Sequence, residues 1–150
     1  MLFITYKIVF KKVASCANYT GYSTKGRRKN KMDGLCYCGN ISDLKVEADI
    51  GAGAIWCNKC YSNFNIEDFP ISIKLKAELQ EWILQYGKWI DWNNDGIFPN
   101  GVALEEIHNK EGLILTEKVQ KELAGKYKVS FSPSTFAKRY ANRIYPPYLH

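Results

Sequence analysis

Residues 36–60 read CYCGNISDLKVEADIGAGAIWCNKC and contain two close pairs of cysteines. One residue separates Cys36 from Cys38, and two residues separate Cys57 from Cys60. Two thiolate pairs that lie about 15–20 residues apart are a common ligand set for tetrahedral zinc. We therefore expect these four cysteines to bind one structural Zn2+. Such a site has a filled coordination shell and no open position for a catalytic water.

Three alternatives to a zinc site stay open for these cysteines. Disulfides need an oxidising compartment, and residues 1–12 make a poor export signal because Lys7 interrupts a very short apolar run. A redox dithiol motif is expected to open a helix, whereas Cys57 and Cys60 follow a strand-like segment. The third alternative is four ordinary buried thiols. The fifth cysteine, Cys16, stands alone, and we assign it no role.

The passage resembles zinc-ribbon proteins in two elements, Cys36-x-Cys38-Gly39 and Cys57-x-x-Cys60. The first pair departs from the common form because it is one residue shorter. Zinc ribbons serve many purposes, so this resemblance implies a metal and no particular activity. Residues 36–40 and 44–51 also resemble small uncharacterised proteins of spore-forming bacteria and their prophages, a likeness that implies no known activity either.

The segment between the cysteine pairs predicts a β-hairpin. Residues 44–48 alternate apolar and polar side chains, which is typical of a half-buried strand. Gly51 and Gly53 suit a turn, and residues 54–56 return toward the second cysteine pair.

The chain after residue 70 predicts a mainly helical region with one short strand. Apolar side chains recur there at helical spacing, and near residue 129 they alternate. We expect helices over residues 73–89, 102–111 and 113–124, a strand over 127–131, and a last helix from 132. Phe136, Tyr140 and Ile144 are expected to form the buried stripe of the last helix. The predicted fold class is α+β, a zinc-ribbon hairpin followed by this helical region.

We divide the chain into three parts: residues 1–31, a zinc-ribbon-like module over residues 32–70, and a helical α+β region over residues 71–150 packed on that module. Residues 1–31 hold eight Lys or Arg and no acid, and they supply the excess in the net charge of +6. Their composition cannot bury an apolar face, so we expect disorder. The basic run before Met32 can also be encoded by a ribosome-binding sequence. This raises the hypothesis that residues 1–31 are a translated leader; the alternative is a native basic tail.

For two polar patterns we prefer a structural role to a catalytic or calcium-binding one. Asp91 and Asp95 match the opening of a calcium loop, but Val102 stands where a bidentate Glu is required. We therefore expect a polar turn there. His108 lies near Glu105 on an expected helix, with no nucleophile in an interpretable relation to it. We expect it to be a surface histidine.

The function that fits these features best is a non-enzymatic, cytoplasmic, zinc-stabilised interaction protein of bacterial, prophage or accessory-gene origin, with a protein partner. A nucleic-acid-binding zinc ribbon is the alternative, because the chain from Gly112 onward has seven bases and two acids. The residues expected to contact nucleic acid in that case are Lys128, Lys138, Arg139 and Arg143. An enzyme that uses His108 ranks third. No stretch reaches the apolar length of a membrane span.

Overall fold

The hairpin predicted between the cysteine pairs is present and lies in the middle of a four-stranded sheet. The structure is a computed structural model that describes residues 36–39 and 41–144. The expected leader or tail, residues 1–31, lies outside the described residues. The elements are β1 (Asp43–Val46), β2 (Ile55–Cys57), β3 (Asn63–Phe64), a 3-10 turn (Ile66–Asp68), α1 (Ile73–Gln85), β4 (Ile90–Asp91), β5 (Gly96–Ile97), α2 (Gly101–Glu122), β6 (Lys128–Phe131) and α3 (Phe136–Ile144).

The sheet joins segments that are far apart in the sequence. Its strand order is β3-β2-β1-β6, and β1 pairs with β2 in the antiparallel direction. On its other side, β1 pairs with β6 in the parallel direction, with Leu44 opposite Val129. Parallel neighbours need a long crossover, and α1 and α2 lie within it. The expected short strand is therefore confirmed, and it completes the sheet begun by the hairpin.

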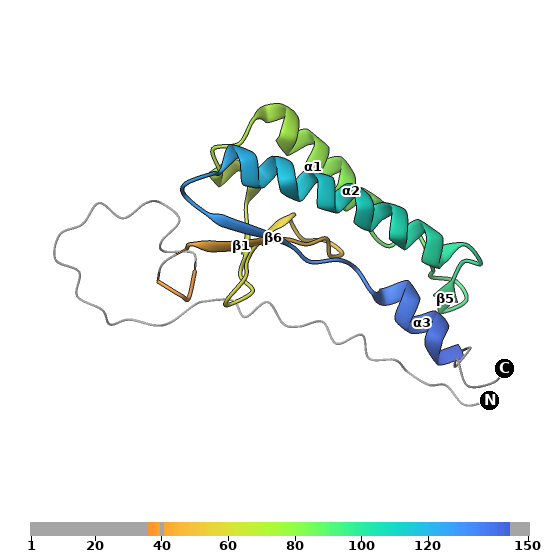
Figure 1. The fold of residues 1–150 in the computed structure, drawn as a ribbon. Coiled ribbons are helices and arrows are strands. Elements are labelled where there is room, and N and C mark those ends of the chain that lie inside the picture. The colour runs from red at the N-terminus through yellow and green to blue at the C-terminus, as the bar shows by residue number, and fades with distance from the viewer. Residues whose placement is uncertain (1–35, 40, 145–150) are drawn as a thin grey trace.

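One face of this sheet is apolar and is covered by α1 and α2 (Figure 1). Leu44, Val46, Ile55 and Cys57 alternate with more polar neighbours, and all four are buried. They belong to one core cluster with the buried side of α1, including Leu79. The predicted α+β class is confirmed, as a two-layer arrangement with helices on one face of the sheet.

The first helix begins as its sequence predicts but ends early. The Ser72 side chain accepts a hydrogen bond from the Leu75 amide, which is an ordinary N-terminal cap. The helix ends at Gln85 instead of residue 89, because Gly87 adopts a φ of +81°, a left-handed conformation that glycine tolerates. Trp89 is therefore outside the helix and buried.

The two helices expected around residue 112 are a single helix of 22 residues. A Cβ at Gly112 would lie 2.5 Å from the Trp82 ring and 2.6 Å from the Phe131 ring. Glycine at this position therefore lets α2 approach both α1 and the sheet closely. Glycine lowers the helix propensity at this position, but a larger residue would separate the two layers.

The last helix differs from the predicted one in its start and its buried side. Helix α3 begins at Phe136, four residues after the expected start. Phe136 is 45% exposed, whereas Ala137 is fully buried. The reason is that the Glu105 carboxylate accepts hydrogen bonds from the backbone amides of Ala137 and Lys138, which turns Ala137 toward α2. None of the helices in the described part of the chain is both long and apolar enough to span a membrane.

Gly112→Ala should destabilise the protein by about 2 kcal/mol, because the cost of overpacking exceeds the gain in helix propensity. The free energy of unfolding from urea titration measures this loss. Lys110→Ala, at an exposed position of the same helix, is the matched control and should change stability by less than about 0.5 kcal/mol. A Gly112→Ala protein as stable as the wild type would contradict the close approach.

Candidate metal centre

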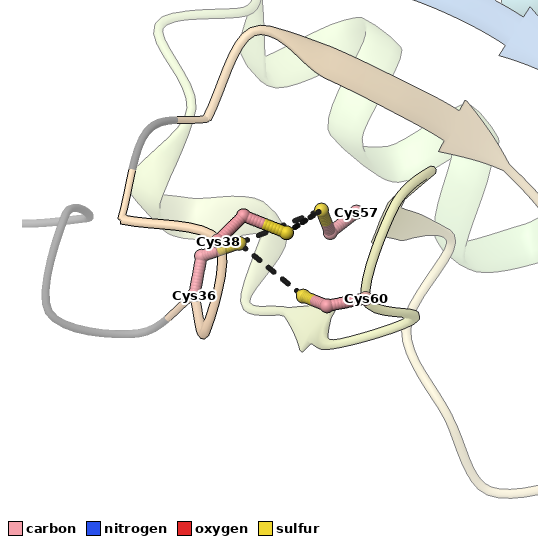
Figure 2. A group of neighbouring side chains, drawn as sticks. All are labelled: Cys36, Cys38, Cys57 and Cys60. Carbon is pink, nitrogen blue, oxygen red and sulfur yellow. Dashed lines mark hydrogen bonds between the residues drawn. The ribbon is translucent and has the colours of Figure 1, made fainter.

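The four predicted ligands lie together. Cys36 and Cys38 belong to the turn before β1, Cys57 ends β2, and Cys60 lies in the turn toward β3. Figure 2 shows their side chains pointing toward one another from these two turns. The four Sγ atoms all lie within 4.8 Å of one another. The hairpin thus brings both pairs to one end of the sheet.

Local hydrogen bonds fix each of the two cysteine turns. Before β1, the Gly39 amide donates to the Cys36 carbonyl at 3.2 Å, and Gly39 has a φ of +69°. After β2, the Cys57 amide donates to the Ser62 carbonyl at 2.8 Å, which closes the loop that contains Cys60. Both turns therefore hold their thiols in place through backbone geometry.

The spacing of the sulfur atoms suits a single tetrahedral ion. Cys36 Sγ lies 3.3 Å from Cys60 Sγ and 3.4 Å from Cys57 Sγ, and Cys38 Sγ lies 3.8 Å from Cys57 Sγ. A Zn–S bond of about 2.3 Å in a tetrahedron separates the sulfurs by about 3.8 Å. All four described cysteines are free thiols. The residues present therefore fit a metal with four thiolate ligands.

The thiols differ in how readily they lose a proton. Burial raises the pKa of the Cys36 thiol, and burial also raises the pKa of Cys38. Burial has the same upward effect at Cys60, but hydrogen bonds from Ser62 and the neighbouring thiols outweigh it and lower the pKa to about 6. The Ser62 hydroxyl lies 3.2 Å from Cys60 Sγ. Because a metal needs thiolates, binding must expel the protons of the less acidic cysteines.

Ser62 was not among the residues predicted for the site. Its only signal in the sequence is its place two residues after the second cysteine pair. A hydroxyl that contacts a ligating sulfur helps to orient the ligand and to stabilise its charge.

Of the four residues predicted to contact nucleic acid, three lie on α3 and one lies on β6. Arg139 and Arg143 line a pocket of about 410 Å3, whose lining also includes Glu47 and Asp49. Lys128 begins β6, at the end of that strand away from α3 (Figure 1). Lys138 lies on α3, where its backbone amide donates to Glu105. The arginines thus share their pocket with carboxylates, which reduces its attraction for phosphate.

The expectation that His108 is a surface histidine was wrong. The residue is 4% exposed, and its ring stacks on Trp82 with centroids 4.7 Å apart and planes 8° from parallel. Neither ring nitrogen has a hydrogen-bond partner, and the indole of Trp82 donates to the His108 carbonyl at 2.9 Å. Burial lowers the pKa of His108 to about 4, although the nearby Glu105 carboxylate opposes this shift. His108 is therefore a neutral member of the core near pH 7.

Glu105 does not pair with His108 as a catalytic acid would. Its carboxylate accepts hydrogen bonds from the Ser134 hydroxyl at 2.6 Å and from the Ala137 amide at 2.9 Å. These donors belong to the start of α3 and the turn before it, where a carboxylate is stabilising. Glu105 thus acts as the cap of a helix that lies about thirty residues later in the sequence, a role that no local pattern predicts.

The polar turn expected instead of a calcium loop is present. It connects β4 and β5, and the Asp91 carboxylate accepts hydrogen bonds from the amides of Asn93 and Asn94. The hydrogen bond from the Asn94 side chain, together with those from the amides of Asn94 and Asn93, lowers the pKa of Asp91. The aspartate therefore stabilises its own turn, as aspartates commonly do.

Comparison with known proteins gives one family. A family model described as Serratia CdiI immunity protein-like matches residues 42–134, well over half of the chain. A search of the curated proteins finds no match. The matched segment contains Cys57 and Cys60 but begins after Cys36 and Cys38. The complete cysteine cluster is therefore not covered by the family match.

Stability should fall as the pH is lowered from about 6.5 toward 4, because the unfolded chain takes up a proton on His108 before the folded chain does. The contribution of neutral His108 to the free energy of unfolding is fully present above the pKa that this residue has in the unfolded chain. It amounts to at most about 3 kcal/mol. Urea titrations at pH 7.0, 5.5 and 4.5 measure this slope. His108→Phe keeps an aromatic ring against Trp82 and should reduce the dependence of the free energy of unfolding on pH. An identical slope in the two proteins would exclude His108 as its source.

Proposed function

The chain belongs to the Serratia CdiI immunity protein-like family, and from this premise we propose that it is an immunity protein that binds a toxin protein and blocks its action. The observation that carries the proposal is the extent of the match. Residues 42–134 include the whole sheet and both helices that cover it. The likeness therefore extends over the folded core of the chain rather than over one motif.

Binding rather than catalysis also agrees with the chemistry of the described residues. His108 is buried and neutral among aromatic rings, and Glu105 is occupied as a helix cap. These two residues were the only acid–histidine pair that the sequence suggested. A metal with four cysteine ligands has no open position for a substrate. Each of these features supports a binding function, in which the residues that act lie on the surface of the protein.

We further propose that Cys36, Cys38, Cys57 and Cys60 bind one Zn2+ with a structural role. The support is the sulfur spacing and the soft character of four thiolates, which select Zn2+ over harder cations. The ion would join the turn before β1 to the turn after β2. It would act as a cross-link between segments that the sheet alone does not hold together at this end.

This assignment favours the cytoplasm of a bacterium as the place of action. Four free thiols persist in a reducing compartment, where disulfides are rare. The family description names Serratia, which agrees with a bacterial origin. Origin from a prophage stays a prediction.

The zinc assignment predicts about one Zn2+ per purified chain, measured by elemental analysis of protein expressed without added metal. Cys38→Ser should lower both the zinc content and the melting temperature, because it removes one ligand. Zinc affinity should rise with pH, because the thiols with raised pKa must lose protons to bind the ion.

Cys16→Ser is the matched control for the cysteine change, because Cys16 is not one of the four proposed ligands; it should retain the metal. Well-folded wild-type protein without any bound metal would rule out the zinc assignment.

The immunity proposal predicts rescue of growth. Each open reading frame beside the gene is expressed from an inducible promoter, and one that arrests growth should become harmless when this chain is produced with it. The toxin and this chain should then purify as a complex. An immunity protein of an unrelated family serves as the control for specificity. Failure of the folded chain to neutralise or bind any such toxin would reject the function.

A further inference from the structure

Exposed aliphatic side chains are concentrated on the two helices that cover the sheet. Among the described residues, six large aliphatic side chains are exposed, and five of them lie on α1 or α2. The five are Ile73, Leu84, Ile107, Leu113 and Ile114. Single exposed apolar residues are ordinary, whereas a group on one layer marks a site of association.

Three of these side chains belong to the stretches of α1 and α2 that run side by side. The Glu78–Lys118 ion pair and the stacking of Trp82 on His108 show that α1 and α2 run antiparallel. The C-terminal half of α1 therefore lies beside the stretch of α2 between Ile107 and Lys118. Residues 107, 111, 114 and 118 of α2 recur at helical spacing, and Lys118 of this row reaches α1.

We call Leu84, Ile107 and Ile114 the outer helical patch. Leu84 is 74% exposed, and the two isoleucines are each more than half exposed. The sheet packs against the opposite side of both helices, and no other described element lies over their outer side (Figure 1). The patch therefore faces away from the core and is accessible to another molecule.

The charges around the outer helical patch are mainly negative. Apart from the Glu78–Lys118 pair, the exposed charged groups on these turns of α1 and α2 are four carboxylates and one ammonium group: Glu81, Glu106, Glu111, Glu117 and Lys110. None of these five groups has an ion-pair partner within the described part of the chain, whereas Glu78 is paired with Lys118. Apolar side chains bordered by unpaired carboxylates are complementary to an apolar surface bordered by Lys or Arg.

We propose that the outer helical patch is the surface that binds the toxin, and that the toxin presents an apolar contact flanked by basic side chains. This inference rests on the proposed immunity function and adds the place and the chemistry of the contact. The aliphatic side chains supply the desolvated centre of the interface. The exposed Glu81 and Glu111, on the adjacent stretches of α1 and α2, attract the basic rim of the partner during association.

A second copy of the chain is a less suitable occupant. In a two-fold dimer each surface meets the same surface of its partner. Two patches with the same unpaired carboxylates would then face each other, and like charges in an interface oppose association. The charge of the patch thus favours a different, basic protein.

The test uses the toxin identified by growth rescue and measures its affinity for variants of the full chain. Leu84→Arg and Ile114→Arg should each weaken binding at least about 30-fold, because each introduces a charge at the apolar centre. The double change Glu81→Lys with Glu111→Lys should lower the association rate constant about tenfold and weaken its dependence on salt. All three proteins should keep the circular dichroism spectrum of the wild type, because the altered side chains are exposed.

Ile73→Arg and Ile50→Arg are the matched controls. Both are exposed isoleucines outside the three patch residues, Ile73 at the start of α1 and Ile50 in the hairpin, and their replacement should leave the affinity unchanged. If the wild type binds the toxin and the patch variants bind equally well, the patch is excluded while the immunity function stands. If the folded wild type binds no toxin, both proposals fail. Sedimentation that shows a wild-type dimer dissociated by Leu84→Arg would identify the occupant as a second copy and overturn the inference.

Discussion

The parallel pairing of β1 with β6 is the contact on which the rest of the structure depends. It joins the hairpin near residue 45 to a strand more than eighty residues later. The crossover between these strands contains both large helices, which must return across the same face of the sheet. Gly112 permits that return, because only a residue without a side chain fits between Trp82 and Phe131. The core, the exposed side of the helices and the place of α3 all follow from this crossover.

The cysteine cluster depends on a different and more local constraint. The antiparallel register of β1 and β2 brings the turn before β1 close to the turn after β2. This arrangement needs only the hairpin and the two short turns. The family match begins at residue 42, so it includes the hairpin without the first cysteine pair. The cysteine cluster and the family core are thus two adjoining features: the cluster lies at one end of the sheet, and the core includes the helices that cover one face of it.

The two sides of the helical layer differ: one side builds the core, and the other side is exposed. Toward the sheet, Trp82 and His108 stack in the core, and Glu105 holds the start of α3. Away from the sheet, aliphatic side chains and unpaired carboxylates are exposed. The acid and the histidine that first suggested catalysis are therefore used to build the fold. The surface that remains available has the mixed apolar and charged character of a protein-binding site.

The sequence by itself determined the features that depend on near neighbours. The alternation in residues 44–48 predicted β1, the spacing of Leu75, Leu79 and Trp82 predicted α1, and the hairpin made the meeting of the four cysteines foreseeable. Only the tertiary structure decided that β6 pairs with β1, that His108 is buried and that Glu105 caps α3. Each of these three outcomes is a contact between residues far apart in the chain. Local periodicity reports which side of an element is apolar, whereas the partner of that side is set by how the whole chain packs.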